Sequence, residues 1–243
     1  MRFSLVTINT WKCDGDYKTR IPLLASQLKF TEADFFACQE VFHSVDEFLS
    51  TKEHFKKVLQ MVPRFFPSRR KHRNIETERI LSFSGLCSFT NLNVVEYEEH
   101  FLPNHIDDGE RTAQLIVVKH GNYRVGIINT HLTHVKGQDD LRVSQLRKML
   151  NNIEDITIDL LILCGDLNST PESKAVQFLR SEQKFQNVFN NKATHVGGQC
   201  IDYIFYRTNR LCEIKEQKII LNEPINNLLL SDHCGLFVDF EII

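Results

Sequence analysis

Short apolar runs separated by polar segments recur along the whole chain. Runs of this kind, rich in Val, Ile and Phe and bounded by turn residues, are typical of β-strands. They predict strands over residues 3–8, 34–39, 81–90, 93–98, 113–119, 123–129, 159–164, 201–206, 213–221 and 234–242. Helical periodicity is clearest over residues 20–29, 46–61, 139–152 and 173–180, with Asp46 and Pro171 as start signals. So many strands do not fit a simple doubly wound fold.

Two local patterns indicate how these strands are arranged. The run Leu160-Leu161-Ile162-Leu163 has no polar alternation, so this strand should be buried on both faces. Residues 119–123, Lys-His-Gly-Asn-Tyr, have the composition of a hairpin turn, which indicates an antiparallel pair. We therefore expect an α/β fold, a four-layer sandwich in which two packed mixed β-sheets are flanked by helices.

Composition and length favour one globular domain. The 243 residues are 42% hydrophobic and 25% charged, and we find neither an internal repeat nor a long linker in them. We expect residues 1–243 to form a single catalytic domain. The net charge of −2 gives no global basic field, so a polyanionic partner would have to be held locally.

Signals for secretion, membrane insertion and disulfide bonding are weak in this sequence. The apolar run Phe3–Ile8 is too short for a signal peptide, and no run reaches the roughly 18 apolar residues of a membrane span. We expect a soluble, cytoplasmic chain without membrane contact, and no obligate protein partner is evident. The seven cysteines are odd in number and widely spaced, which favours reduced core thiols over disulfides or a zinc ribbon.

Polar side chains recur where apolar runs end. Asn9, Glu40 and the pair Asn129 and His131 each follow such a run. Open α/β sheets place ligands at strand ends. The sharpest case is Gly165-Asp166-Leu167-Asn168, where a fully apolar strand stops and delivers a carboxylate and an amide two positions apart.

A second group lies near the end of the chain. Asp202 stands in apolar surroundings, and burying such a charge requires a partner, which we seek in the adjacent Asp232 and His233. One carboxylate after a strand is more often a turn or a cap than a catalyst, but six such features together favour a site. Their hard oxygen groups suit Mg²⁺ or Mn²⁺, and phosphoester hydrolysis is the natural use of such an ion beside an acid and an imidazole.

The polar motifs follow one another in a fixed order. They are Asn9, Gln39-Glu40, Asn129-Thr130-His131-Leu132, Gly165-Asp166-Leu167-Asn168, Ile201-Asp202-Tyr203 and Ser231-Asp232-His233. This ordered set, spread over residues 6–240, resembles the endonuclease/exonuclease/phosphatase family. The resemblance implies a four-layer α/β sandwich and a metal-dependent phosphoric ester hydrolase, nuclease-like, with Mg²⁺ as cofactor and Mn²⁺ as a substitute.

The resemblance also implies which residues bind metal and substrate. Glu40 would be the principal Mg²⁺ ligand, with Asn9 and Asp232 lining the metal site directly or through water. Asn129 and Arg111 are expected to contact the substrate. A lone arginine before a strand, such as Arg111, is equally consistent with a solvated side chain.

Five further residues are implied to be catalytic. Asp166 and Asn168 would position the attacking water and a phosphate oxygen. His131 would hydrogen-bond the scissile phosphate. His233, oriented by Asp202, would act as a base or as a phosphate stabiliser, and whether Asp166 or His233 accepts the proton stays open at this point.

Local similarities within the family bear on the substrate. Residues 129–132, followed by Arg142 and Gln145, are more similar to the branch of deadenylases, tyrosyl-DNA phosphodiesterases and sphingomyelinases than to the abasic-site endonucleases. Residues 231–236 resemble the corresponding segment of tyrosyl-DNA phosphodiesterases. The chain departs from many members at Cys200, where they carry a basic residue, which leaves one phosphate contact in doubt.

Residues 64–73 contain five Lys or Arg and two aromatic residues. Basic side chains neutralise phosphates and exposed aromatic rings stack on bases, so Arg69 and Arg70 are expected to bind a polyanionic substrate. The alternative is a solvated loop with Phe65 and Phe66 packed in the core. We rank a nucleic-acid phosphodiester first, ahead of a phosphatase for a small phosphorylated metabolite or inositol phosphate, and ahead of a non-catalytic polyanion-binding module.

Two other ligand classes are disfavoured. His131 and His134 are three positions apart at a strand end, which does not put them on one face, and no nearby thiolate completes a zinc site. Most of the 18 phenylalanines follow strand or helix periodicity, which indicates core packing rather than a lipid-binding surface.

Overall fold

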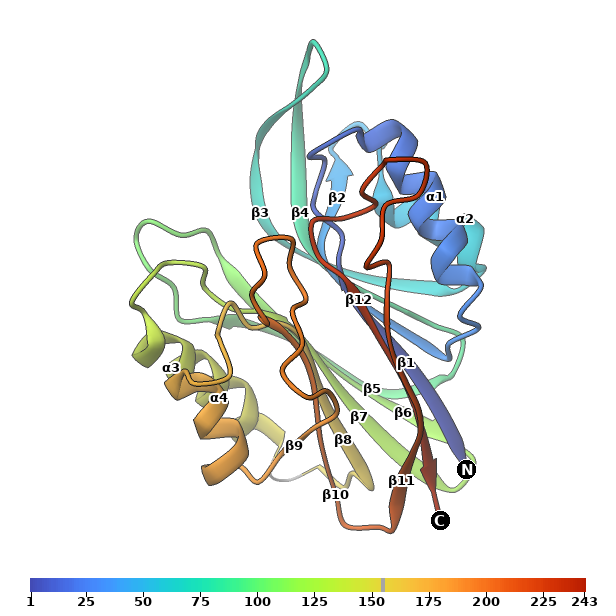
Figure 1. Ribbon diagram of the computed structural model, residues 1–243, viewed down its shortest axis with the longest axis vertical. Helices are drawn as coiled ribbons and strands as arrows, with labels where there is room; N and C mark the ends of the chain where they lie inside the picture. The colour runs from blue at the N-terminus through green and yellow to red at the C-terminus, as the bar shows by residue number, and fades with distance from the viewer. Residues whose placement is uncertain (154–155) are drawn as a thin grey trace.

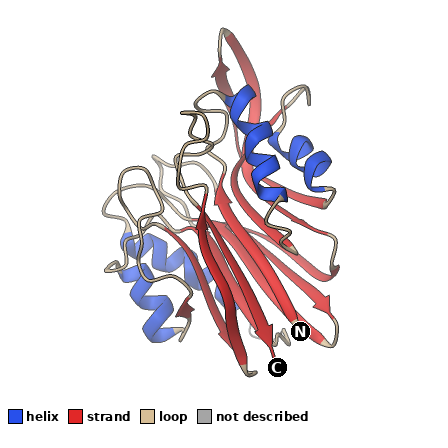
Figure 2. Cartoon of the chain, turned by 45° about the vertical axis from the view of Figure 1, so that its right-hand side comes forward, coloured by secondary structure: helices blue, strands red, loops and turns tan. Residues whose placement is uncertain are grey.

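Two six-stranded β-sheets pack face to face, and helices cover their outer faces (Figures 1 and 2). The computed structural model describes residues 1–153 and 156–243. The first sheet has the order β11 (Cys212–Ile220), β12 (Gly235–Ile242), β1 (Arg2–Asn9), β2 (Phe35–Ser44), β4 (Glu78–Thr90) and β3 (Val62–Ile75). The second has the order β5 (Asn93–Leu102), β6 (Arg111–His120), β7 (Tyr123–His131), β8 (Leu160–Asp166), β10 (Asp202–Thr208) and β9 (Gln186–Asn187). Each sheet combines one parallel pair, β1 with β2 or β7 with β8, with antiparallel neighbours.

The helices fall into two pairs, one on each sheet. Packed on the first sheet are α1 (Tyr17–Lys29) and α2 (Thr51–Leu59). Packed on the second are α3 (Asp139–Leu150) and α4 (Lys174–Gln177), followed respectively by a 3₁₀ turn at Asn151–Ile153 and a π-helical turn at Phe178–Glu182. Side chains of Asp16, Ser50 and Ser173 accept backbone hydrogen bonds at the starts of α1, α2 and α4, which satisfies amides that a helix leaves free.

Three apolar layers hold these four layers of secondary structure together. In β1, Phe3 and Leu5 face the second sheet, whereas Val6 and Ile8 face α1 and α2. The third apolar layer lies between the second sheet and α3 and α4. Because the central strands are buried on both faces, their sequences are continuous apolar runs, as in β8, where all seven residues are buried. The predicted four-layer α/β sandwich is confirmed.

The main difference from the prediction is the segment 62–75, which forms an edge strand instead of a loop. It pairs with β4 along its length, and the hairpin of β3 and β4 extends beyond the sandwich (Figure 1). Its charged residues and its two prolines, Pro63 and Pro67, do not resemble a central strand, but an edge strand tolerates both. Of the two phenylalanines that the loop alternative packed in the core, Phe66 is buried and Phe65 is half-buried.

A smaller difference concerns α2. The helix begins at Thr51, after the cap residue Ser50, and not at Asp46. Asp46 instead closes a tight turn, because its Oδ1 accepts hydrogen bonds from Ser44 Oγ at 2.5 Å and Phe48 N at 3.1 Å. Asp46 is therefore satisfied before the helix starts.

The ends of four central strands meet at one end of the sandwich. Gln39 of β2 donates to Asn129 Oδ1 of β7 at 2.8 Å, and Asn9 of β1 donates to Asp166 Oδ2 of β8 at 3.1 Å. These bonds cross from one sheet to the other and fix the strand ends relative to each other. Elsewhere, the seven cysteines are free thiols, and no described helix is long and apolar enough to cross a membrane.

Candidate active site

Glu40 is aimed into the site by an irregularity in β2. The pairing of β2 with β4 shifts register between Cys38 and Val41, and Glu40 has φ 53°. A bulge of this kind redirects one side chain without ending the strand. Glu40 Oε1 forms an ion pair with Lys12 Nζ at 2.9 Å and lies 4.0 Å from His131 Nδ1. Burial, followed by repulsion from Asp166, raises the Glu40 pKa, although Lys12 opposes the shift.

Asp166, at the end of β8, contacts most of the other polar groups. Its Oδ2 accepts from Asn9 Nδ2 at 3.1 Å, and its Oδ1 accepts from the backbone amide of Asn168 at 2.9 Å. His131 Nε2 lies 3.3 Å and His233 Nε2 lies 3.8 Å from Asp166 Oδ2. Burial first, and then the neighbouring Asp202 carboxylate, raise the Asp166 pKa. The carboxylate is thus a stronger base than an exposed aspartate.

Gly165 explains why Asp166 can reach this position. Its φ is +130°, and a Cβ there would lie 2.0 Å from the carbonyl oxygen of Thr130 and 3.2 Å from Gln39 Nε2. Only glycine allows β8 to approach β7 this closely at the last step before the carboxylate. The site therefore requires glycine at position 165, immediately before Asp166.

His233 and Asp202 form a buried pair. His233 Nδ1 is 2.8 Å from Asp202 Oδ2, which also accepts from Thr194 Oγ1 at 2.7 Å. Burial opposes the charged imidazole, but attraction and hydrogen bonding from Asp202, with further attraction from Asp166 and Asp232, raise the His233 pKa to about 10. At neutral pH the ring is an imidazolium whose Nδ1–H is held by Asp202.

His131 differs from His233 in its charge. Burial, and then repulsion from Arg111 and Lys12, hold the His131 pKa well below its usual range. A neutral His131 therefore lies between Glu40 and Asp166, one ring nitrogen facing each carboxylate. The site combines one neutral and one cationic imidazole, which distinguishes their chemical roles.

The carboxylates fit a divalent cation. The Asp232 Oδ1 and Asp202 Oδ1 atoms are buried and have no hydrogen-bond partner among the described residues. Ligand atoms of Asp166, Asp202 and His233, and those of His195, Asp232 and His233, lie within 4.8 Å of one another. With Glu40 nearby, the site offers several hard oxygen donors, a composition that suits Mg²⁺ or Mn²⁺. Asn9 lies beside this group, with one amide lone pair accepting from Trp11 N at 3.0 Å.

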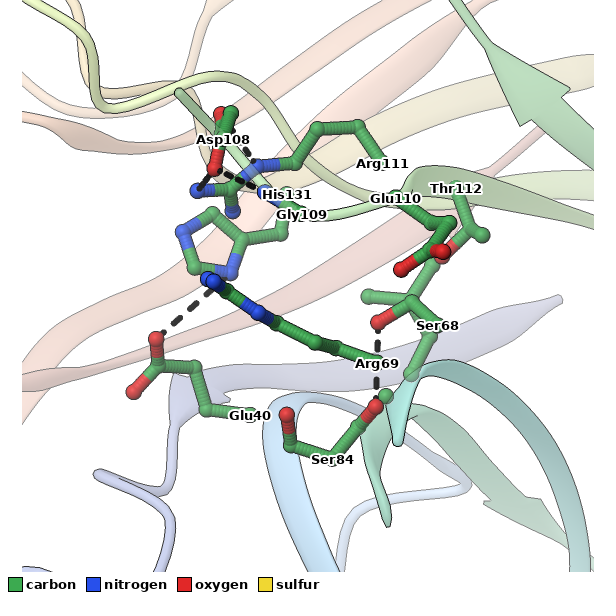
Figure 3. A pocket seen from close by; sticks show the side chains of 12 residues that line it. Glu40, Ser68, Arg69, Ser84, Asp108, Gly109, Glu110, Arg111, Thr112 and His131 are labelled. Carbon is green, nitrogen blue, oxygen red and sulfur yellow. Dashed lines mark hydrogen bonds and ion pairs between the residues drawn. The ribbon is translucent and has the colours of Figure 1, made fainter. Parts of the chain in front are cut away.

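A pocket opens beside Glu40 and His131, lined by residues of β2, β3, β4, β6 and β7 and by the segment 108–110 (Figure 3). Arg69 lines it from β3, and Arg111 lines it from the start of β6. Arg111 is not solvated, because it donates to Asp108 at 2.8 and 2.9 Å and to His134 Nδ1 at 2.7 Å. Burial opposes ionisation of Asp108, but hydrogen bonds from Arg111 and Thr133 lower its pKa to about 2. Arg111 is thus fixed at the rim by a buried anion.

Two predicted substrate contacts lie elsewhere. Asn129 is fully buried between the sheets, where its Oδ1 accepts from Gln39 and its Nδ2 faces Cys38 O and Ser88 Oγ at 3.3 Å. Asn129 is therefore enclosed between the sheets and does not face the pocket. Arg70 is exposed, lies on the face of β3 opposite to Arg69 and stacks over the Phe83 ring at 5.9 Å, so it is not brought to the pocket. Asn168 lies beside Asp166, donating to Leu132 O at 3.1 Å.

Three residues at the site were not predicted from the sequence. Arg20 is fully buried and donates to the carbonyls of Thr10, Trp11, Lys12, Asp14 and Leu230. Its place on the apolar face of a predicted helix was the available signal. Lys12 and His195 lie on loops, and their roles depend on tertiary contacts. His195 packs edge-on against His233, with ring centroids 4.8 Å apart, and lies 3.7 Å from Asp232.

Comparison with a curated protein gives a distant relative. Protein angel homolog 2 of Danio rerio is 22% identical over 187 residues, which cover 69% of this chain and 30% of that protein. The chain thus aligns with less than a third of that relative's length. The match is consistent with the family branch that residues 129–146 predict.

Solved structures share the fold across nearly the whole chain. An endonuclease/exonuclease/phosphatase from Beutenbergia cavernae superposes with a TM-score of 0.80 at 18% identity, covering 99% of this chain and 72% of that one. The human Nocturnin catalytic domain, solved with a bound sulfate anion, gives a TM-score of 0.77 at 19% identity, covering 100% and 95%. Residues 6–233 match the sequence profile of one family, and with the motifs converging as described, the chain belongs to the Endonuclease/Exonuclease/phosphatase family.

Proposed function

We propose that this chain is a Mg²⁺-dependent phosphoesterase, for which Mn²⁺ can substitute, and that residues 1–243 act as one catalytic domain. Its reaction is hydrolysis of a phosphodiester by attack of water. The observation that carries the proposal is the convergence of Glu40, Asp166, His131 and the His233–Asp202 pair at one end of the sandwich. Membership of the family supports it.

Glu40, Asp232 and Asn9 would hold the metal ion. When bound, the ion supplies positive charge that neutralises phosphate oxygens and the leaving oxyanion. Because Lys12 already pairs with Glu40, the carboxylate is held in place before a metal arrives. The Lys12 ammonium is then available to a phosphate oxygen as well.

The two imidazoles and Asp166 have different roles in the reaction. His233, as an imidazolium oriented by Asp202, donates its Nε2–H to a phosphoryl oxygen and stabilises the negative charge of the transition state. Asp166, whose pKa is raised toward neutrality, accepts the proton of the attacking water. Neutral His131 hydrogen-bonds the scissile phosphate, and Asn168 helps to position the water.

A nucleic-acid phosphodiester is the substrate that we propose first. Arg69 and Arg111 line one pocket beside Glu40, so a phosphate bound there meets two guanidinium groups. The hairpin that carries Arg69 extends beyond the sandwich, which offers a longer strand further contacts (Figure 1). The Nocturnin domain, which has the same fold, binds a sulfate anion.

Three substrates run in parallel test the proposal. They are single-stranded DNA or RNA, a 5′-tyrosyl oligonucleotide and an inositol phosphate, each with and without Mg²⁺. Cleavage of an oligonucleotide with a steep loss of affinity at high salt is expected, because several cations contact phosphates. Turnover of inositol phosphate alone, insensitive to salt, would replace the nucleic acid by a small phosphorylated metabolite. Metal-independent binding of polyanions without any turnover would indicate a non-catalytic module.

A further inference from the structure

Strand β3 presents three basic side chains on one face. Arg69, Lys71 and Arg73 alternate along the strand, and from Arg69 onward its pairing with β4 is regular. Alternate residues of a strand share a face. Arg69 lines the pocket with Glu40, so the face that carries all three cations is the one turned toward the site.

A fourth cation comes from the loop after β1. Lys12 contacts Glu40 at 2.9 Å. Burial and then repulsion from Arg69, Arg73 and Lys12 lower the pKa of Lys71, which shows that these side chains lie within range of each other's charge. We call Lys12, Arg69, Lys71 and Arg73 the β3 cation cluster.

Arg73 is the most constrained member of the cluster. Its side chain is buried, with the residue 7% exposed, and it donates to Ser82 O at 3.1 Å, Ser82 Oγ at 2.9 Å and Ser84 Oγ at 2.6 Å. Its Nε atom has no hydrogen-bond partner among the described residues. Burying a guanidinium that has only neutral partners and one unpaired donor destabilises the fold, unless an anion accepts a hydrogen bond from that donor.

The anions of this protein do not balance the cluster. The carboxylates of Glu40 and Asp14 lie within range of the charge on Arg73. Glu40 would be committed to the metal ion, which adds two further positive charges. Four basic side chains then oppose two remaining carboxylates, those of Asp14 and of Glu110, which lines the pocket with Arg69, and the imbalance favours an anionic ligand.

We propose that the β3 cation cluster is a second phosphate-binding subsite, which holds a phosphate group of the substrate other than the one that is hydrolysed. The inference rests on the proposed function and narrows it, because the substrate must carry at least two phosphate groups. A nucleic-acid strand and a multiply phosphorylated small molecule both have this chemistry. The scissile phosphate lies at Glu40, where Lys12 and Arg69 begin the cluster, and its neighbour lies further along β3, at Lys71 and Arg73.

Equilibrium binding tests the subsite without turnover. We would compare adenosine 3′,5′-bisphosphate with adenosine 5′-phosphate by calorimetry in the presence of Mg²⁺. The parent chain should bind the bisphosphate more tightly by about tenfold, the value of one charge-assisted hydrogen bond. Lys71→Ala and Arg73→Met should each bring the ratio of the two affinities close to one. Because Arg73 is buried, thermal unfolding of Arg73→Met is measured in parallel, and exposed Lys71 serves as the test that does not depend on folding.

The matched control is Arg79→Ala, which removes an equal charge from the same hairpin. Arg79 pairs with Asn74 and is exposed on the face opposite to Arg73. It should leave the preference for the bisphosphate unchanged. A parent chain without this preference, or an equal loss in Arg79→Ala and Lys71→Ala, would overturn the subsite.

Turnover separates the two proposals and the two kinds of substrate. A 5′-phosphorylated dinucleotide should have a lower KM than the same dinucleotide without the 5′-phosphate. Turnover of an inositol bisphosphate is measured in parallel to represent small phosphorylated substrates. If nothing is hydrolysed but the bisphosphate preference persists and depends on Lys71, the subsite stands and the proposed function fails. If hydrolysis proceeds with equal KM for both dinucleotides in parent and Lys71→Ala, the function stands and the subsite fails.

Discussion

At the scale of single residues, the site depends on how burial and neighbouring charges set the charge of each imidazole. Asp202 holds His233 in its cationic form, whereas burial, and then repulsion from Arg111 and Lys12, keep His131 neutral. Two histidines therefore have different roles, because their surroundings give them different charges. This difference could not be predicted from the sequence, because it arises from residues that are far apart in the chain.

Asp202→Asn tests the charge of His233. In the parent chain His233 loses its proton only as the pH rises through its pKa of about 10, so kcat/KM should fall on the alkaline side near that pH. Removing the Asp202 charge lowers the His233 pKa, and the alkaline limb should move to lower pH. The rate at neutral pH should drop by about 10²-fold, as the oriented imidazolium is lost. A pH–rate profile with an unmoved alkaline limb would contradict the assignment, and His233→Gln, which should lack that limb, is the control.

At the scale of elements, the loop between β1 and α1 is held by one side chain. Arg20 of α1 donates to five backbone carbonyls, four of them in residues 10–14, and thereby positions Lys12 beside Glu40. Trp11 and Lys12 have positive φ angles of 55° and 41°, so the loop needs such contacts to keep its shape.

Arg20→Leu should destabilise the protein and displace this loop. The five carbonyls lose a charged donor, which should cost about 3 kcal/mol and lower Tm by about 6 to 12 °C. Thermal unfolding checks the expectation. Lys18→Ala on the same helix is the control, because Lys18 and its partner Glu76 are exposed and such pairs contribute little. Equal Tm values for the two variants would contradict the role of Arg20.

Element positions were predicted well where burial decides the pattern. The apolar runs located the central strands, and the polar residues at their ends located most of the site. Prediction was poor at the edge, where β3 needs no apolar face and could not be distinguished from a loop. The position of Asn129 at a strand end likewise did not reveal that it points between the sheets.

At the scale of the whole molecule, the site exists only where the two sheets meet. The first sheet and its loops supply Asn9, Glu40 and His233, and the second supplies His131 and Asp166. Bonds from one sheet to the other connect them, such as Asn9 to Asp166. Because neither sheet alone brings these groups together, we expect activity to be lost with global unfolding.

The most direct test of the central claim is Mg²⁺-dependent hydrolysis by the parent chain and by Glu40→Gln. A single-stranded oligonucleotide is the substrate, EDTA removes the metal, and Glu78→Gln, at the exposed tip of the hairpin, is the matched control. We predict that EDTA abolishes product release and that Glu40→Gln lowers it by about 10²-fold or more without lowering Tm. Glu78→Gln should match the parent. Hydrolysis at the parent's rate by Glu40→Gln, or in the presence of EDTA, would contradict the account.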